Sequence, residues 1–347
     1  MKRTIETLND RERQILSALI DHYIKTAQPV GSRVLANRYN LGISPATIRN
    51  TLQDLEEMGL VSQPHTSAGR IPTDLGYRVY VDRLLKPEKL TPEERLSIQE
   101  QLESKFSAIE QILEQTSRIL AEVTSQLGLT TAPEFDKAIV TRLEMIPVAE
   151  RRLLVVIAVK SGIVKTILME VDSTLSNHTV SETTRALNEK LVGLSLGEIR
   201  RTIADRFKEV RLGDPKLLKV FADSFESISN EVQKGSLHVG GTSNILRQPE
   251  FRDNESLDKI LGAIEQKQEL ASIVSGTALA DGIVVTIGKE ANLGNFEMCS
   301  LVTSTYNAGR SKGTIGVIGP TRMKYSKLVS IVDYTAKLLS KLLSEKE

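Results

Sequence analysis

The chain has 347 residues, of which 40% are hydrophobic and 26% are charged, and its formal net charge is +1. This balance is typical of a globular protein with two or three domains, and no apolar run reaches the roughly 18 residues that a membrane span needs. The start of the chain lacks the apolar core of a secretory signal, and the single cysteine, Cys299, excludes an internal disulfide. Together these features predict a cytoplasmic protein.

Two helices are predicted at the start of the chain. The first begins at Asn9, and Glu12 three residues later completes a capping-box pattern. Apolar residues then repeat at helical spacing until a Gln-Pro pair interrupts the pattern. A second, shorter helix is expected from about Ser32, with Val34 and Leu35 facing the core.

The third predicted helix has strong signals at its beginning. Ser44 is suited to the N-cap position, and Pro45 occupies the first helical position, where its missing N–H costs no hydrogen bond. Ile48, Leu52 and Leu55 fall on one face, which we expect to be buried. Helix, short helix, turn and helix together predict a helix-turn-helix unit.

A short hairpin is predicted directly after this helix. Residues 60–64 have the pattern of a strand, 65–69 form a small polar tip, and 70–72 return along the first strand. Thr73 then caps another helix that runs to Leu85. A two-stranded hairpin after a third helix defines a winged helix, which is a common DNA-binding unit.

The polar face of the third helix and the tip of the hairpin have the chemistry of a DNA contact. Five Lys or Arg and three acids lie between residues 22 and 73, and all three acids come late in the third helix. Arg, Asn and Gln side chains can bridge two base-edge atoms, while hydroxyls, backbone and charge at the tip suit phosphate or the minor groove. A solvated helix face beside an ordinary hairpin is the alternative interpretation. The candidate DNA-contacting residues are Ser44, Thr47, Arg49, Asn50 and Gln53 in the helix, and His65, Thr66, Ser67, Gly69 and Arg70 at the tip.

The rest of the chain predicts an α+β domain with an insertion. Helical periodicity between residues 91 and 127, carried by positions that include Phe106 and Leu127, predicts one long helix or two helices. The apolar stripe fits either a subunit seam or a helix lying on its own domain. Three strands follow, then a largely helical region, then three more strands and a closing helix. The expected strands are 138–146, 153–159, 163–171, 283–287, 298–306 and 313–318, and the closing helix is 325–343. The expected division is 1–86, 87–175, 176–268 as the inserted domain, and 269–347.

Signals for an enzyme or a metal site are poor. The four histidines, at positions 22, 65, 178 and 238, have no second His or Cys at ligand spacing. The glycine-rich stretch 309–319 lacks the Gly-Lys-Ser/Thr ending of a P-loop and is better interpreted as a turn entering a strand. Cys299 lies in a predicted strand and is expected in the core. We therefore predict no catalytic residues, no metal and no cofactor.

Several stretches resemble the HrcA family of bacterial heat-inducible transcription repressors. They are LNDRERQILSALIDHYIKTAQPVGSRVLA (8–36), SPATIRNTLQDLEEMGLV (44–61), HTSAGRIPTDLGYRVYVDRLL (65–85) and FEMCSLVTSTYNAGRSKGTIGVIGPTRMKY (296–325). The run HTSAGR-PT-GYR-YVD is not shared by generic winged helices, and the resemblance covers essentially the whole chain.

The resemblance implies a fold and a function. It implies an α+β multidomain protein with an N-terminal winged helix-turn-helix and a GAF-like domain that contains an inserted dimerisation domain. It also implies a homodimer that represses chaperone operons by binding an inverted repeat in double-stranded DNA, and whose activity the chaperonin maintains. A transcription factor gated by a small molecule in the GAF-like domain is the alternative, and an enzyme with an appended DNA-binding module is the third hypothesis.

Overall fold

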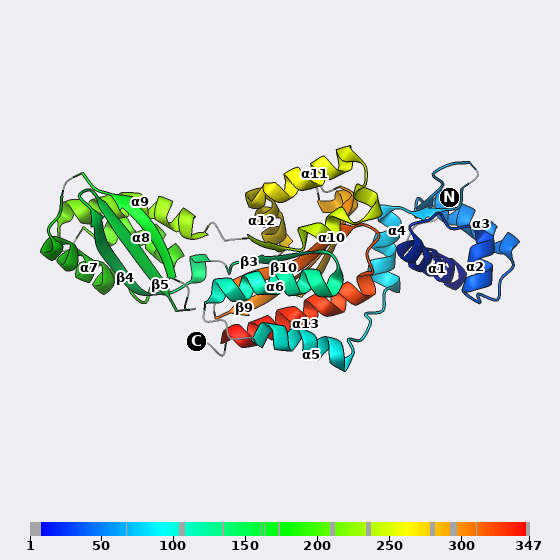
Figure 1. Ribbon diagram of the computed structural model, residues 1–347, viewed down its shortest axis with the longest axis horizontal. Helices are drawn as coiled ribbons and strands as arrows, with labels where there is room; N and C mark the ends of the chain where they lie inside the picture. The colour runs from blue at the N-terminus through cyan, green and yellow to red at the C-terminus, as the bar shows by residue number, and fades with distance from the viewer. Residues whose placement is uncertain are drawn as a thin grey trace.

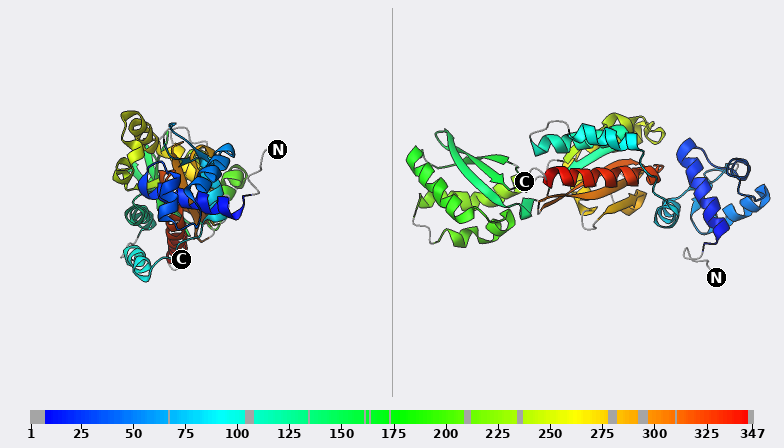
Figure 2. Two further views of the ribbon diagram at one scale, coloured as in Figure 1. Left: turned by 90° about the vertical axis from the view of Figure 1, so that its right-hand side faces the viewer. Right: turned by 90° about the horizontal axis from the view of Figure 1, so that it is seen from below.

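Three units lie in a row along an elongated molecule (Figures 1 and 2). The computed structural model describes residues 8–66, 68–103, 108–133, 135–160, 162, 164–172, 174–208, 212–233, 237–277, 282–291, 297–309 and 311–344. The winged-helix domain lies at one end, a central domain built on a five-stranded sheet lies in the middle, and an inserted unit lies at the far end.

The N-terminal domain is a winged helix, as the sequence predicts. Its elements are α1 (Asp10–Thr26), α2 (Ser32–Arg38), α3 (Pro45–Glu57), β1 (Val61–Ser62), β2 (Ile71–Pro72) and α4 (Asp74–Val79), which continues into a π-helical turn, η2 (Tyr80–Leu84). The capping box between Asn9 and Glu12 is present, and β1 pairs with β2 antiparallel. Leu35 is fully buried, but Val34 is 37% exposed, so the prediction that both face the core is wrong for Val34.

Two helices connect this domain to the central sheet: α5 (Pro92–Glu103) and α6 (Ile109–Thr124). The buried face of α6 packs on the sheet of its own domain, which favours that interpretation over a subunit seam. The structure has two helices here, as one of the two alternatives predicted, but the helical segment does not reach Leu127, because this residue begins strand β3. Phe106 lies outside the described residues.

The central domain is a three-layer structure. Its antiparallel sheet has the order β7-β3-β10-β9-β8, formed by β3 (Leu127–Thr131), β7 (Leu237–Gly240), β8 (Ile283–Ile287), β9 (Cys299–Ala308) and β10 (Ser311–Pro320). Helices α6 and α13 (Tyr325–Ser344) cover one face. The other face is covered by α10 (Thr242–Leu246), α11 (Asn254–Glu265), α12 (Lys267–Gly276) and the short η4 (Pro249–Phe251). Cys299 is 1% exposed in this core, as predicted.

The inserted unit has its own sheet. Strands β4 (Val140–Ala149), β5 (Arg152–Val159) and β6 (Val164–Glu170) form an antiparallel sheet of order β4-β5-β6. Helices α7 (Asn177–Leu191), α8 (Leu196–Arg206) and α9 (Pro215–Gln233) share a core with one face of this sheet, and η3 (Phe135–Lys137) leads into it. The opposite face of the sheet is not covered by these helices.

The expected ranges 87–175, 176–268 and 269–347 cut across these units. Within the described ranges, strands β4 to β6 pair only with one another and pack with α7 to α9, so they belong to the insertion and not to the central domain. Strand β7, within the expected insertion, pairs with β3 in the central sheet, and α11 packs on that sheet. By strand pairing, the insertion begins after β3 and ends before β7.

Candidate nucleic-acid interface

Helix α3 is held by its cap and by its buried stripe. The Ser44 hydroxyl accepts a hydrogen bond from the Thr47 backbone N–H at 3.1 Å, and Pro45 begins the helix, as predicted. Ile48, Leu52 and Leu55 are 0%, 4% and 0% exposed against the core of the domain. Because one face is buried, the opposite face of α3 is fixed in its direction toward solvent.

The exposed face of α3 brings together the predicted base-reading residues. Arg49, Asn50 and Gln53 are exposed, and helical geometry places Asn50 opposite the buried stripe. Thr47 is half-buried, and its hydroxyl lies 2.9 Å from that of Ser44. The first turns of α3 therefore present amide, guanidinium and hydroxyl groups that can bind base edges in a major groove.

The tip of the wing is shaped by Gln63, which is not among the predicted DNA-contacting residues. The Gln63 side-chain amide donates to the carbonyls of Thr66 and Ala68, both at 2.9 Å. His65 and Thr66 are exposed at the tip, as a DNA contact requires. Ser67 lies outside the described residues. Glutamine in a polar loop gives no signal for this role, because the two carbonyls are recognised only once the loop is folded.

Gly69 makes a close approach within the protein. A Cβ at this position would lie 2.4 Å from the Val30 carbonyl carbon, so only glycine fits. The backbones of Val30 and Arg70 exchange two hydrogen bonds, of 2.8 and 2.9 Å. The expectation that Gly69 admits close approach to DNA thus has a competing explanation, since this glycine docks the wing on the segment between α1 and α2.

The Arg70 guanidinium is paired with a carboxylate of α3. Its Nη2 lies 2.7 Å from Glu56 Oε2, and the two side chains are only 20% and 31% exposed. In this arrangement Arg70 ties the wing to the C-terminal half of α3 and does not extend into solvent. In the sequence, Glu56 is only one of the three acids late in this helix. Its partner Arg70 lies 14 residues further on, a separation that does not identify an ion pair.

The remaining candidate sites lack the groups for metal or nucleophilic chemistry. The described part of the chain contains no group of three or more His, Cys, Asp or Glu that could hold a metal ion. Burial raises the pKa of the Cys299 thiol, which disfavours the reactive thiolate. A cleft of about 340 Å³ lies between α12 and β8, and its one charged lining residue, Glu290, is engaged by Arg78. No described helix is long and apolar enough to cross a membrane.

The fold and the exposed polar face define a winged-helix DNA-binding regulator. The family model described as "Winged helix-turn-helix transcription repressor, HrcA DNA-binding" matches residues 7–83, and the model of the HrcA protein C-terminal domain matches residues 110–329. The chain belongs to the HrcA family of heat-inducible transcription repressors and is a repressor, not an enzyme.

Individual relatives agree with this assignment over nearly the whole chain. The heat-inducible transcription repressor HrcA of Geobacter sulfurreducens is 39% identical over 97% of this chain and 98% of its own length. The protein of the same name from Natranaerobius thermophilus is 40% identical, over 98% of both chains. A crystal structure of a hypothetical protein, 27% identical, matches with a TM-score of 0.60 and covers 98% of this chain and 100% of that one.

Proposed function

We propose that this repressor binds an inverted-repeat operator as a homodimer and controls chaperone operons in the cytoplasm. Arg49, Asn50 and Gln53 bind base edges in the major groove. Ser44 and Thr47, at the start of α3, contact the DNA backbone, and the wing tip binds the adjacent phosphates. The observation that carries the proposal is the exposed polar face of α3 beside an exposed wing tip. Arg70 acts mainly by holding the wing, since Glu56 occupies its guanidinium.

The outer face of the β4-β5-β6 sheet supports the homodimer. Ile146, Val148, Val164 and Leu168 are between 46% and 52% exposed on the two outer strands. The register sets Leu154 of β5 between Ile146 and Leu168, which makes a continuous apolar row. Exposed apolar patches of this kind mark protein interfaces, and a second copy of this sheet offers a self-complementary surface.

Modulation by the chaperonin is carried over from the resemblance to the HrcA family. We include it in the proposal as the partner that maintains repression under normal conditions. Its test is repression measured with and without the purified chaperonin in a transcription assay. Equal repression in both reactions would contradict it.

DNA binding by the purified protein tests the reading role of α3. One duplex carries the family's inverted repeat and the other a scrambled version, each at two salt concentrations. Arg49→Ala should cost about 1–3 kcal/mol on the repeat and little on the scrambled duplex, as a lost bidentate base contact does. Arg151→Ala, an exposed charge in the inserted unit, is the matched control. An equal loss of affinity on both duplexes would mean that Arg49 contacts phosphate and does not read bases.

A further inference from the structure

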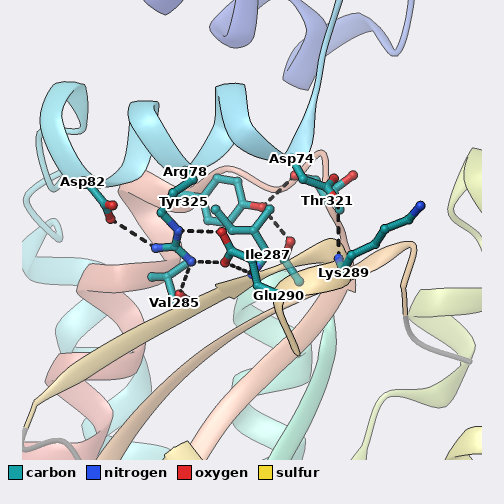
Figure 3. Close-up of polar contacts among 10 residues, drawn as sticks. Asp74, Arg78, Asp82, Val285, Ile287, Lys289, Glu290, Thr321 and Tyr325 are labelled. Atoms are coloured by element: carbon teal, nitrogen blue, oxygen red, sulfur yellow. Dashed lines mark hydrogen bonds and ion pairs between the residues drawn. The ribbon is translucent and has the colours of Figure 1, made fainter. Parts of the chain in front are cut away.

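Helix α4 is bonded to the edge of the central sheet through Arg78. Its guanidinium donates to Glu290 Oε1 at 2.9 Å, also to Glu290 Oε2, and to the Val285 carbonyl at 2.7 Å (Figure 3). Asp82, one turn further along the helix, accepts from the same guanidinium at 3.1 Å and orients it. Arg78 is 212 residues from Glu290 in the chain, and the two side chains are 26% and 35% exposed.

The same contacts complete the open edge of the sheet. Strand β8 is the last strand of the sheet in the described part of the chain, where no other strand pairs with its outward backbone groups. Arg78 binds the Val285 carbonyl on this edge, and Glu290 Oε2 accepts the Ile287 N–H at 3.0 Å. Glu290 lies in the short turn η6 (Gly288–Ala291), which folds back on β8. Arg78 and Glu290 thus serve as the partner that the edge strand lacks.

Further contacts fix the orientation of the winged helix on the central domain. Asp74, at the start of α4, accepts the Lys289 backbone N–H at 3.2 Å. Arg322 donates to the Ile24 carbonyl in the last turn of α1 at 2.8 Å and pairs with Glu250 at 2.6 Å. The Arg322 side chain is only 13% exposed. Contacts to both α1 and α4 prevent the domain from pivoting about a single point.

Arg78 and Glu290 also keep each other charged. Burial alone would raise the pKa of the Glu290 carboxyl, but hydrogen bonds from Arg78 and from the Ile287 N–H outweigh burial and lower it. The ion pair is therefore intact at neutral pH. It weakens only as the pH falls below the ordinary pKa of a glutamate carboxyl.

We infer that Arg78 and Glu290 determine which half-site spacing the repressor accepts, an inference that rests on the proposed dimer on an inverted repeat. A dimer joined through its inserted units presents two α3 helices at a distance and angle set by the intervening junctions. If the junction is rigid, only one spacing brings both helices into the major groove on one side of the duplex. If the junction is loose, each winged helix can adjust to its own half-site.

The first test measures the orientation without DNA. Spin labels on Asn37→Cys in α2 and Asp258→Cys in α11 report the distance between the two domains. Both positions are exposed, and the native Cys299 is 1% exposed and does not compete for the label. The labelled chain is diluted with unlabelled protein, so that each dimer carries at most one labelled subunit. The native protein should then give one narrow distance distribution, and Arg78→Glu, which sets two carboxylates face to face, should broaden it. An equally narrow distribution in Arg78→Glu would overturn the inference.

Additional variants separate the ion pair from general damage. The exchanged pair R78E/E290R restores the opposite charges but not the bonds to the Val285 carbonyl and the Ile287 N–H, so it should narrow the distribution only in part. Gly288→Ala should broaden it by another route, because Gly288 has a left-handed φ of 51° and a methyl there would displace the Asp74 carboxylate that accepts the Lys289 N–H. Lys289→Ala is the matched control, since Lys289 joins the junction through its backbone N–H and its side chain points away (Figure 3). A distribution as broad in the exchanged pair as in Arg78→Glu would contradict the role of the ion pair.

The second test measures spacing selectivity. The probe is an inverted repeat that the protein selects from randomised duplexes, with the spacer then lengthened by about 5 or about 10 base pairs, half a turn or one turn. The native protein should lose at least 10-fold in affinity on both longer spacers, and Arg78→Glu should lose less than 3-fold. A native protein that binds a lone half-site as tightly as the repeat would refute the dimeric operator. If the native protein is selective for one spacer and Arg78→Glu shows the same dependence of affinity on spacer length, the inference about Arg78 and Glu290 is refuted, while the dimeric operator stands.

Discussion

The two ends of the molecule each carry an open face, and the two faces differ in chemistry. On α3 the exposed side chains are Arg49, Asn50 and Gln53, which bind best to polar groups with fixed geometry. On the outer face of the inserted sheet they include a row of aliphatic residues, with Leu168 at 50% exposure and Val148 at 52%, beside the ion pairs Arg142–Glu144 and Arg152–Glu170. The difference indicates that each end suits a different partner, and that the central domain must relate the two.

The open faces also differ in how they are supported. Helix α3 is fixed by a cap, a buried stripe and the ion pair from Glu56 to the wing. The outer face of the inserted sheet is held by strand pairing on either side of β5. A polar recognition surface needs individually oriented side chains, whereas an apolar one needs area, so substitutions should affect the two ends in different ways.

The largest effect is expected from a charge on the apolar face. Leu168→Asp should separate the dimer, because a carboxylate would be buried unpaired in the interface. Losing the second half-site contact should lower operator affinity by about 10²–10⁴-fold. Sedimentation velocity and operator titration measure both effects. Leu96→Asp on α5, at 55% exposure, is the matched control and should leave both unchanged. A Leu168→Asp protein that remains dimeric would remove this face from the proposal.

A smaller effect is expected where the wing joins α3. Glu56→Gln should release Arg70 toward the DNA, so affinity for random duplex rises and the salt slope steepens by about one unit. Preference for the operator should fall, because the wing is no longer held. Asp54→Asn is the control, since it removes an exposed carboxylate of the same helix without touching the wing. An equal change in operator preference for both variants would mean that Glu56 acts only through its charge.

Matched helix caps sharpen the comparison of the two ends. Ser44 caps α3 and Ser176 caps α7, and each hydroxyl accepts the N–H of a threonine three residues later, at 3.1 and 3.0 Å. Replacing either serine by alanine should cost about 1 kcal/mol of stability. Only Ser44→Ala should also weaken operator binding. Thermal unfolding and DNA titration of both variants provide the measurement, and equal operator affinity would argue that the start of α3 lies outside the contact.

The smallest effect is a pH dependence of the winged helix. Burial lowers the pKa of His22, and the charges of Arg38 and Lys25 lower it further. The unfolded chain therefore binds this proton more readily, so folding stability is present above pH 6.5 and declines as the pH falls toward the lowered value. Melting at pH 7.5 and 5.5 should show the decline, and His22→Gln should reduce it. Burial also lowers the pKa of His238 in β7, so this histidine adds to the same pH dependence. The difference between the native protein and His22→Gln therefore gives the contribution of His22 in the winged helix alone.

The sequence predicted the winged helix well because its signals are local. Caps such as Asn9 with Glu12, or Ser44 with Thr47, act over three residues and are visible as patterns. The sheets were harder, because strand periodicity does not say which strands pair. Thr131 of β3 contacts Thr314 of β10, 183 residues away, and β7 is a four-residue strand within a helical region. The insertion was therefore recognised, but its limits were misplaced.

The candidate site follows the same rule. The exposed residues of α3 could be selected from helical period and residue type, since both are properties of a short stretch. The supporting contacts could not, because each joins positions that only the fold brings together. Gly69 meets Val30, and Arg78 meets Glu290. The contact residues were thus more visible in sequence than the residues that orient them.

The pairing of β3 with β7 has a consequence for how such a protein is assembled and altered. The chain leaves the central sheet at Thr131 and re-enters it at Leu237, and these two residues are direct partners across the sheet. Exit and return are therefore only about 5 Å apart, the distance that a tight hairpin turn spans. The inserted unit is therefore joined to the central sheet by two adjacent chain segments at one place. One insertion into an ancestral gene could have added it, and an engineer could exchange it for another pairing module without disturbing the sheet that receives it.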